Sequence, residues 1–317
     1  MKSLKKIQNR IKDLILLSFS LLVLQSCNKD EYEVIGDNLP SATSVNNLFD
    51  IGLSSKIQVA TFDASTTYLF TSEKGVKLTI NGSCLRKNGN PVTGQVKLKF
   101  IEILDRGNML VTNKPTMGLD AASNEKRLLI SGGEFYIATS QDGVELTSTC
   151  LMDLSVPTSL TGGTDTAMLP FAGQVATDGN LTWEQATGVD FSIQTGPGGV
   201  PYYNLLFQNF GWFNCDRFAN YTGLKTSITT FVPEGYANAS FIFLSSKDFP
   251  NSLGKSFGKY PVGMECYIIF VTEKGGKFRY AIKPATPLTE NHQVTFSLSE
   301  TTLGTQAELV TALNALP

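Results

Sequence analysis

The chain has 317 residues, of which 42% are hydrophobic and 17% are charged, and its formal net charge is −2 at pH 7. This length is ample for a buried core and exceeds what one domain usually needs, so two domains are expected. Past residue 12 there is no cluster of Lys and Arg, which a phosphate-binding surface would need. We therefore expect no nucleic-acid partner.

The first 26 residues have the pattern of a secretory signal. The segment MKSLKKIQNRIK is basic and contains no acid, and an apolar run from Leu14 to Leu24 follows it. A run of about ten residues is too short to cross a bilayer as a helix, which takes about 20 residues. The sequence therefore predicts a cleaved signal peptide over residues 1–26 rather than a lasting membrane span.

A cysteine, Cys27, follows this signal directly. The segment Leu24-Gln25-Ser26-Cys27 resembles the lipobox of bacterial lipoproteins, in which the cysteine becomes the lipidated first residue. The residues after it resemble the lipoprotein export signal of the Bacteroidota, and the matching positions are Lys29, Asp30 and Glu31. These resemblances imply palmitate or a related lipid on Cys27. They also imply a protein anchored to the outer membrane that faces the cell exterior.

Residues 27–47 are polar and rich in Asn, Asp and Ser, which predicts a flexible tether. The sequence then changes to short runs in which apolar and polar residues alternate, such as Val76–Ile80 and Val96–Phe100. This period of two is typical of half-buried strands. Asp142-Gly143 is a strong hairpin signal between two further runs. We therefore predict a β-sandwich over residues 48–155.

Residues 156–200 are rich in Gly, Thr, Pro and Asp. Because a loop of this length inside a compact domain would be unusual, we interpret the segment as an interdomain linker. Within it, Asp165-Thr166-Ala167 resembles the acceptor for O-linked glycans in exported Bacteroidota proteins. This resemblance makes Thr166 a candidate O-glycosylation site.

Residues 201–317 return to strand patterns and end in a different one. Gly275-Gly276 predicts a hairpin between two of the strands. In the tail, Leu309, Leu313 and Leu316 recur at helical spacing and predict an amphipathic helix over residues 305–316. The expected fold class is thus all-β, with two β-sandwich-like domains and a short C-terminal helix.

Several segments together resemble a known family. They are Asn90–Gly94, the run VKLKFIEILDRGNMLVTNKPT from Val96, and SGGEFYIATSQDGVEL from Ser131. They resemble the ZU-type β-sandwich of ankyrins and netrin receptors, and more closely a bacterial version in uncharacterised Bacteroidota surface lipoproteins. The segment GWFNCDRF from Gly211 resembles a part of the same bacterial proteins that stands just ahead of their second β domain. The insertion at residues 119–124 departs from that pattern. The resemblance implies an interaction or spacer module and brings no catalytic residues.

Four cysteines follow Cys27 in the mature chain, namely Cys84, Cys150, Cys215 and Cys266. Four cysteines allow three disulfide connectivities. Because domains of this size do not need covalent staples, we expect buried free thiols, or one bridge at most.

The sequence offers few residues that are typical of catalytic sites. The chain has one histidine, His292, no Gly-x-Ser-x-Gly elbow, and no calcium or P-loop motif. We therefore expect no enzyme, no cofactor and no metal site. One alternative is a hydrolase with a carboxylate pair from Asp178, Glu184 and Asp190, near Trp183, because such chemistry needs only two acids at the right separation.

Aromatic residues crowd one stretch of the chain, and four of them are candidate ligand-binding residues: Tyr202, Tyr203, Trp212 and Phe213. Exposed rings stack on sugar faces, but rings also dominate the packing of cores, so both interpretations stay open. The leading hypothesis is a non-catalytic cell-surface lipoprotein that acts as a binding or structural module, with glycan as the specific ligand. The alternative is an adhesion or envelope-assembly component that contacts another envelope protein.

Overall fold

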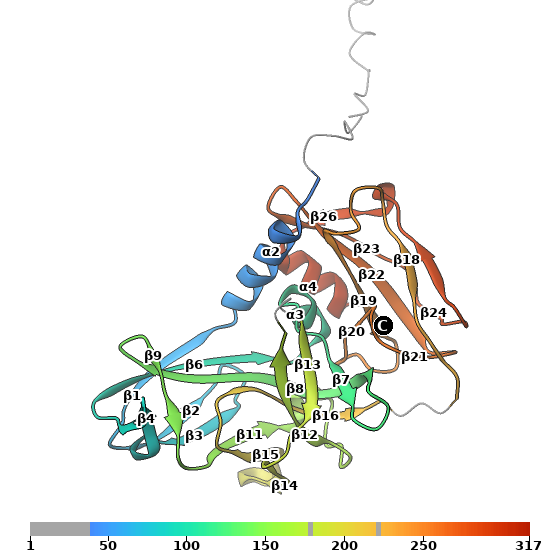
Figure 1. Ribbon diagram of the computed structural model, residues 1–317. Coiled ribbons are helices and arrows are strands. Elements are labelled where there is room, and N and C mark those ends of the chain that lie inside the picture. The colour runs from blue at the N-terminus through green and yellow to red at the C-terminus, as the bar shows by residue number, and fades with distance from the viewer. Residues whose placement is uncertain (1–38, 177–179, 220–222) are drawn as a thin grey trace, which may run out of the picture. The chain divides into compact units, whose positions relative to one another are not determined.

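The computed structural model describes residues 39–176, 180–219 and 223–317, and strands dominate them (Figure 1). The prediction of an all-β fold with a short C-terminal helix is confirmed. The signal peptide, Cys27 and the export-signal residues lie outside the described residues. Among the described residues, no helix is both long and apolar enough to cross a membrane.

Sheet A is the largest sheet, with the order β1-β6-β8-β16-β12-β13-β7 and β9 paired to β8. Its strands are β1 (Gln58–Asp63), β6 (Gln95–Ile103), β7 (Met117–Asp120), β8 (Glu125–Gln141), β9 (Val144–Glu145), β12 (Leu169–Val175), β13 (Leu181–Gln185) and β16 (Gly211–Phe218). β8 is long enough to pair with β6 at its second half and with β7 at its first. Because β7 also pairs with β13, five strands close on themselves at this end of the sheet.

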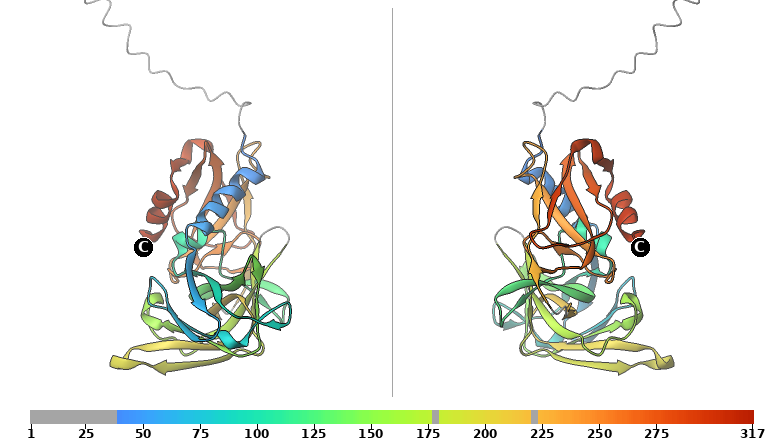
Figure 2. Two further views of the ribbon diagram at one scale, coloured as in Figure 1. Left: turned by 90° about the vertical axis from the view of Figure 1, so that its left-hand side faces the viewer. Right: turned by 90° about the vertical axis from the view of Figure 1, so that its right-hand side faces the viewer.

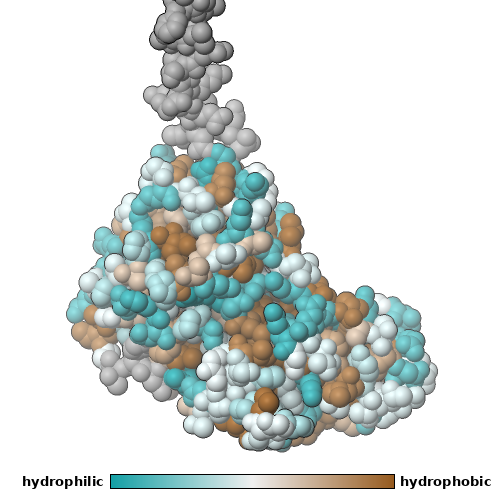
Figure 3. Space-filling view, turned by 180° about the vertical axis from the view of Figure 1, so that it is seen from behind, coloured by the Kyte–Doolittle hydropathy of each residue, from teal (hydrophilic) through white to brown (hydrophobic). Residues whose placement is uncertain are grey.

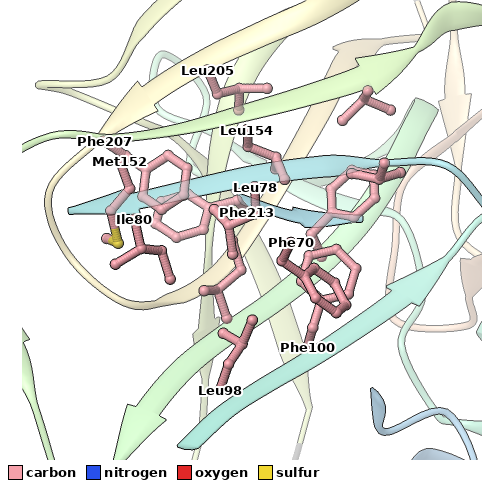
Figure 4. Close-up of a cluster of buried hydrophobic side chains, with 14 of the residues drawn as sticks. Phe70, Leu78, Ile80, Leu98, Phe100, Met152, Leu154, Leu205, Phe207 and Phe213 are labelled. Atoms are coloured by element: carbon pink, nitrogen blue, oxygen red, sulfur yellow. The ribbon is translucent and has the colours of Figure 1, made fainter. Parts of the chain in front are cut away.

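Sheet B packs on one face of sheet A and has the order β14-β15-β11-β3-β2. Its strands are β2 (Thr67–Thr71), β3 (Lys77–Asn81), β11 (Met152–Pro157), β14 (Asp190–Thr195) and β15 (Pro201–Phe207). Alternate side chains from both sheets, among them Phe100, Leu78 and Phe207, fill the first core between them (Figure 4). A small sheet of β4 (Leu85–Lys87), β5 (Asn90–Pro91) and β10 (Thr147–Ser148) lies beside this sandwich.

Sheet C is built from the C-terminal part of the chain in the order β20-β19-β22-β23-β26, with β24 on β22. Its strands are β19 (Ser240–Ser246), β20 (Gly254–Lys255), β22 (Glu265–Lys274), β23 (Lys277–Ile282), β24 (Thr286–Pro287) and β26 (Thr302–Gly304). Two short pairs accompany it: β17 (Lys225–Thr226) with β21 (Tyr260–Pro261), and β18 (Thr229–Phe231) with β25 (Gln293–Thr295). The β22–β23 hairpin turns at the predicted glycines, both of which have positive φ.

Three helices join the second core, which also takes side chains from the other face of sheet A and from sheet C. They are α2 (Ala42–Ser54), α3 (Arg106–Val111) and α4 (Gln306–Asn314), and the single-turn helices are η1 (Gly82–Cys84), η2 (Thr158–Thr161), η3 (Pro197–Gly199) and η4 (Leu298–Glu300). α4 starts with a capping box, because Thr305 and Glu308 bond each other's backbone amides. Its buried Leu309 and Leu313 confirm the predicted apolar face.

The predicted interdomain linker over residues 156–200 is wrong. β12 and β13 of sheet A and β14 of sheet B lie within it. Its apolar residues are sparse but buried: Phe171, Leu181 and Trp183 have no exposed surface. Gly173 serves close packing, because a Cβ there would lie 2.7 Å from Cβ of Trp212. Glycine provides flexibility in a linker, but in this sheet it allows close contact between strands.

The other predicted boundaries also move. Residues 42–47, assigned to the tether, begin α2, whose Val45 is fully buried in the second core. β15 and β16 were assigned to the second domain of residues 201–317, but they belong to sheets B and A. The first sandwich therefore extends to Phe218, beyond the predicted limit of 155. Residues 39–317 form a single unit, so the predicted division into two domains is not supported.

Candidate functional site

The outer face of sheet B is the candidate site, and we define it by the side chains of β11, β14 and β15 that point away from the first core. Residues alternate along β15: Tyr203 is buried in the first core, whereas Tyr202 and Asn204 belong to the opposite face. The register with β14 places Gln194 beside Tyr202 and Ser192 beside Asn204. Figure 2 shows this hairpin, in yellow, along the lower edge of both views.

A chain of hydrogen bonds crosses the two strands of this hairpin. The Tyr202 hydroxyl donates to Oε1 of Gln194 at 2.9 Å. Nε2 of Gln194 donates to Oγ of Ser192 and to Oδ1 of Asn204, both at 3.1 Å. An amide that is bonded through its oxygen and its nitrogen is held in one orientation. The phenol and the exposed amide beside it are therefore ordered before any ligand arrives.

The hydrogen bonds continue onto β11, the next strand of the sheet. Nδ2 of Asn204 donates to Oδ1 of Asp153 at 2.5 Å and to Oγ of Ser155 at 3.3 Å. Asn204 is 4% exposed, so it forms the floor of the face, and Asp153 and Ser155 are half-buried beside it. Exposed Lys77 on β3 pairs with Ser155 in the register and extends the polar row.

The chemistry of this face suits a polyhydroxylated ligand. Tyr202 offers the face of an amphipathic ring, and Asp153, Ser192 and Gln194 offer acceptors and donors at fixed positions near it. Few but well-placed polar groups give a binding site its orientation and specificity. Groups ordered in advance also lower the entropy lost on binding.

Three of the four predicted ligand-binding aromatics do not belong to this face, so the prediction that they form an exposed platform is wrong. Tyr203, Trp212 and Phe213 are 0%, 8% and 5% exposed. Phe213 packs 4.1 Å from Phe207 between ring centroids, and Trp212 contacts Trp183 edge to face at 6.3 Å. Trp212 and Phe213 lie on β16, a central strand of sheet A with the second core on one face and the first core on the other, and Tyr203 points from β15 into the first core. These rings fill cores.

The motif segments Ser131–Phe135 and Gly211–Phe218 lie side by side. β8 and β16 are antiparallel neighbours, with Glu134 opposite Asn214. Nδ2 of Asn214 donates to Oδ2 of Asp216 at 2.6 Å. A buried polar cluster thus joins two segments that stand about 80 residues apart in the chain.

A β-bulge shapes this buried polar cluster. The register shifts between Asn214 and Asp216, so that Cys215 faces the first core while Oδ1 of Asp216 accepts from the Gly132 amide at 3.2 Å. A Cβ at Gly132 would lie 2.5 Å from the Cys215 carbonyl oxygen. Only glycine allows this approach, which explains the glycine of the Ser131-Gly132-Gly133 segment.

The two carboxyl groups of this cluster are fully buried. Burial, reinforced by the charge of Asp216, raises the pKa of Glu134 well above its ordinary value, against the opposing effect of Lys114. Burial likewise raises the pKa of Asp216. Neither oxygen of Glu134 has a hydrogen-bond partner among the described residues. Because no solute reaches either group, the cluster is part of the core rather than a binding site.

The predicted O-glycosylation residue and the proposed acid pair are separated in the fold. Thr166 is exposed in a turn, and its modification stays a prediction. Glu184 lies on β13 of sheet A and Asp190 on β14 of sheet B, while Asp178 lies outside the described residues. The two described acids thus share neither a strand nor a sheet.

The surroundings of the four described cysteines and of His292 are those of structural residues. Cys84 and Cys150 form a disulfide, while Cys215 and Cys266 are buried and free, in agreement with the expectation of one bridge at most. Burial raises the pKa of the Cys266 thiol to about 12, so it is protonated and unreactive at neutral pH. Nδ1 of His292 accepts from the Thr289 amide at 3.3 Å, as a turn residue does.

Exposed hydrophobic side chains give no second candidate site among the described residues. In Figure 3, which shows the molecule from behind, hydrophobic residues occur in separate groups among hydrophilic ones. Among the described residues the most exposed are Leu224 at 66% and Ile51 at 62%. Scattered exposed apolar residues are normal on proteins. The ordered polar face of sheet B is the more specific feature.

Sequence reasoning missed Asp153, Ser192, Gln194 and Asn204. A signal for Ser192 and Gln194 was present, because polar and apolar residues alternate from Asp190 to Gln194. The interpretation of the segment as a linker concealed this pattern.

Comparison with protein-family models finds no family that matches the chain, and comparison with curated proteins finds no relative.

Proposed function

We propose that the protein is a lipid-anchored, non-catalytic cell-surface module that binds glycans through the outer face of sheet B. The observation that carries the proposal is the hydrogen-bonded row Tyr202–Gln194–Asn204–Asp153 on an open sheet face. A half-buried ring beside ordered amide and carboxylate groups matches the chemistry of a sugar, which has an apolar ring face and hydroxyl groups at its rim.

The placement of this face supports the proposal. The described chain begins at Leu39, next to α2 and near β26, whereas β14 and β15 lie at the opposite end of the unit (Figure 1). A lipid on Cys27 would hold the chain from the α2 end. The outer face of sheet B would then lie at the end of the unit that is remote from the attached end.

We further propose that the first sandwich is of the bacterial ZU type. The pairing of the two motif segments in β8 and β16 supports this assignment, because segments that define a family are expected to meet in its core. A domain of this kind would serve as the scaffold that presents sheet B.

The binding experiment is a glycan array followed by titration of the best ligand. We expect Tyr202→Ala and Gln194→Ala to weaken binding by about tenfold or more each, since one ring or one ordered hydrogen bond contributes about 1–2 kcal/mol. The matched control is Phe231→Ala, which removes a ring that is 50% exposed on β18 and should leave binding unchanged. An array without any ligand, or equal affinities for all three variants, would contradict the proposal.

The anchoring experiment is metabolic labelling with a palmitate analogue, combined with protease treatment of intact cells. We expect the label to depend on Cys27 and the protein to be cleaved from outside. Cys27→Ala should lose the label, whereas replacement of Lys29, Asp30 and Glu31 by Ala should keep the label but remove protease access. A labelled Cys27→Ala chain would refute the anchor.

A further inference from the structure

A polar cleft lies apart from the face of sheet B, between the end of α2, the β2–β3 turn and the start of α3. Its volume is about 270 Å³. The lining residues come from three segments and include Ser55, Lys56, Gln58, Glu73, Lys74 and Glu102. Ligand sites usually measure about 300–1,000 Å³, so this cleft has room for one small ring and not for an extended chain.

The wall of the cleft is held by a buried carboxylate. Glu102 is 9% exposed, and its oxygens accept from Nε2 of Gln58 at 2.9 Å, from Oγ of Ser72 at 2.7 Å and from the Lys74 amide at 3.1 Å. The carboxylate is therefore engaged by the protein itself. Its bonds fix the β2–β3 turn, and with it the backbone of Lys74, against the start of β1.

A second carboxylate of the cleft is engaged in the same way. Oδ1 of Asp105 accepts from the Asn108 amide at 2.9 Å and from Nδ2 of Asn314 at 2.8 Å. Its other oxygen accepts from Nδ2 of Asn108 at 2.6 Å. Both carboxylates are thus hydrogen-bonded within the protein and are not left to accept from a ligand.

Three charged groups are left for a ligand. Within the described parts of the chain, neither Lys56 nor Lys74 donates its ammonium group to a carboxylate, and the exposed carboxylate of Glu73 accepts no hydrogen bond. Two ammonium groups and one carboxylate around a small polar cleft suit a solute that carries one negative charge and several hydroxyl donors.

We propose that this cleft binds a hexuronic acid, with the sugar carboxylate between Lys56 and Lys74 and sugar hydroxyls donating to Glu73. The ligand chemistry is the same for a free monosaccharide and for the terminal residue of an acidic polysaccharide. The site is separate from the outer face of sheet B and does not require that face to bind.

The test is isothermal titration of the purified full chain with sodium D-glucuronate, with D-glucose as the uncharged comparison. We expect measurable binding of glucuronate and at least tenfold weaker binding of glucose. The double variant Lys56→Gln/Lys74→Gln should lose at least tenfold in affinity for glucuronate. The matched control is the double variant Lys97→Gln/Lys277→Gln, which makes the same charge change at exposed positions on β6 and β23 and should bind as the wild type does.

The outcomes separate this inference from the proposed function. Tyr202→Ala should bind glucuronate normally, since its ring is on the other site. A trigalacturonide that binds as well as sodium D-galacturonate identifies a chain terminus as the source, whereas binding weaker than that of galacturonate identifies the free sugar. No glucuronate binding by the wild type, equal binding of glucose, or full binding by the double lysine variant overturns the inference.

Discussion

Two polar regions of the first sandwich use similar side chains in opposite ways. On the outer face of sheet B, Asn204 and Gln194 are bonded at both ends of their amides and lie next to solvent. In the buried polar cluster, Asn214 and Asp216 bond each other, while Glu134 has no partner among the described residues. Ordered polar groups at a surface are available to a ligand, whereas ordered polar groups in a core only specify how strands meet. We therefore expect mutations on the outer face of sheet B to weaken ligand binding, and mutations in the buried polar cluster to lower the stability of the fold.

The largest expected effect is that of Trp212→Ala, in the strand of the buried cluster. Removal of a large aromatic side chain that is 8% exposed should lower the free energy of unfolding by about 3–5 kcal/mol. Urea denaturation followed by circular dichroism measures this loss. A loss below about 1 kcal/mol would mean that Trp212 is a surface residue, as the sequence-based hypothesis of an aromatic platform required.

Asp216→Asn should be the next largest in effect. Both oxygens of Asp216 accept hydrogen bonds, one from Asn214 and one from the Gly132 amide, and an asparagine amide replaces one acceptor with a donor. A buried group left without a partner costs about 1–3 kcal/mol. The same denaturation experiment applies, with Asp190→Asn on exposed β14 as the control that should change little. Equal stability of the two variants would contradict the buried network.

Glu134→Gln tests the cluster through pH. Because the pKa of Glu134 is raised in the folded chain, the folded state holds a proton that the unfolded state releases above its ordinary pKa of 4.5. The contribution of Glu134 to stability is therefore fully present below this value, and it falls as pH rises toward the folded pKa, by about 1.4 kcal/mol per pH unit for one group. The glutamine variant should lose this part of the slope and keep the parts that come from the other carboxyl groups. Parallel curves of unfolding free energy against pH would show that Glu134 does not stay protonated.

Tyr202→Ala should have the smallest effect on stability, because its ring is only half-buried. We expect a loss of about 1 kcal/mol or less, since substitutions near the surface rarely exceed this. Thermal unfolding of this variant and of Trp212→Ala measures the difference between their losses of stability. A loss as large as that of Trp212→Ala would place Tyr202 in the core and remove the basis of the binding face.

The sequence predicted the secondary structure better than the way the strands assemble. Alternating runs identified β3, β6 and the β22–β23 hairpin, and helical spacing identified α4, because these patterns are local. The assembly of sheet A depends instead on pairings between distant segments, such as β16 with β8, which leave no local trace. Gly173 shows the difficulty well. The same residue type favours a linker when read locally and close packing when its neighbours are known.

The candidate site was predicted only at Tyr202. Adjacent rings in a strand must point to opposite faces, so one of Tyr202 and Tyr203 had to leave the core, but the sequence did not say which. The choice is made by β11, whose buried Leu154 and Val156 continue the core that Tyr203 enters. Asp153 joins the site from that strand, about 50 residues before Asn204 in the chain.

The bond between Cys84 and Cys150 ties the fold to the place where it forms. It closes a loop of 66 residues, and in the chain-entropy description such a link destabilises the unfolded chain by about 4 kcal/mol. Disulfides persist in oxidising compartments and are rare where thiols are kept reduced. We therefore expect protein produced in a reducing cytosol to have a less stable first sandwich than protein sent through an export pathway, although both share one sequence. Any measurement of the two proposed sites should begin with a count of free thiols, which is two per mature chain when Cys27 carries its lipid and the bridge is formed.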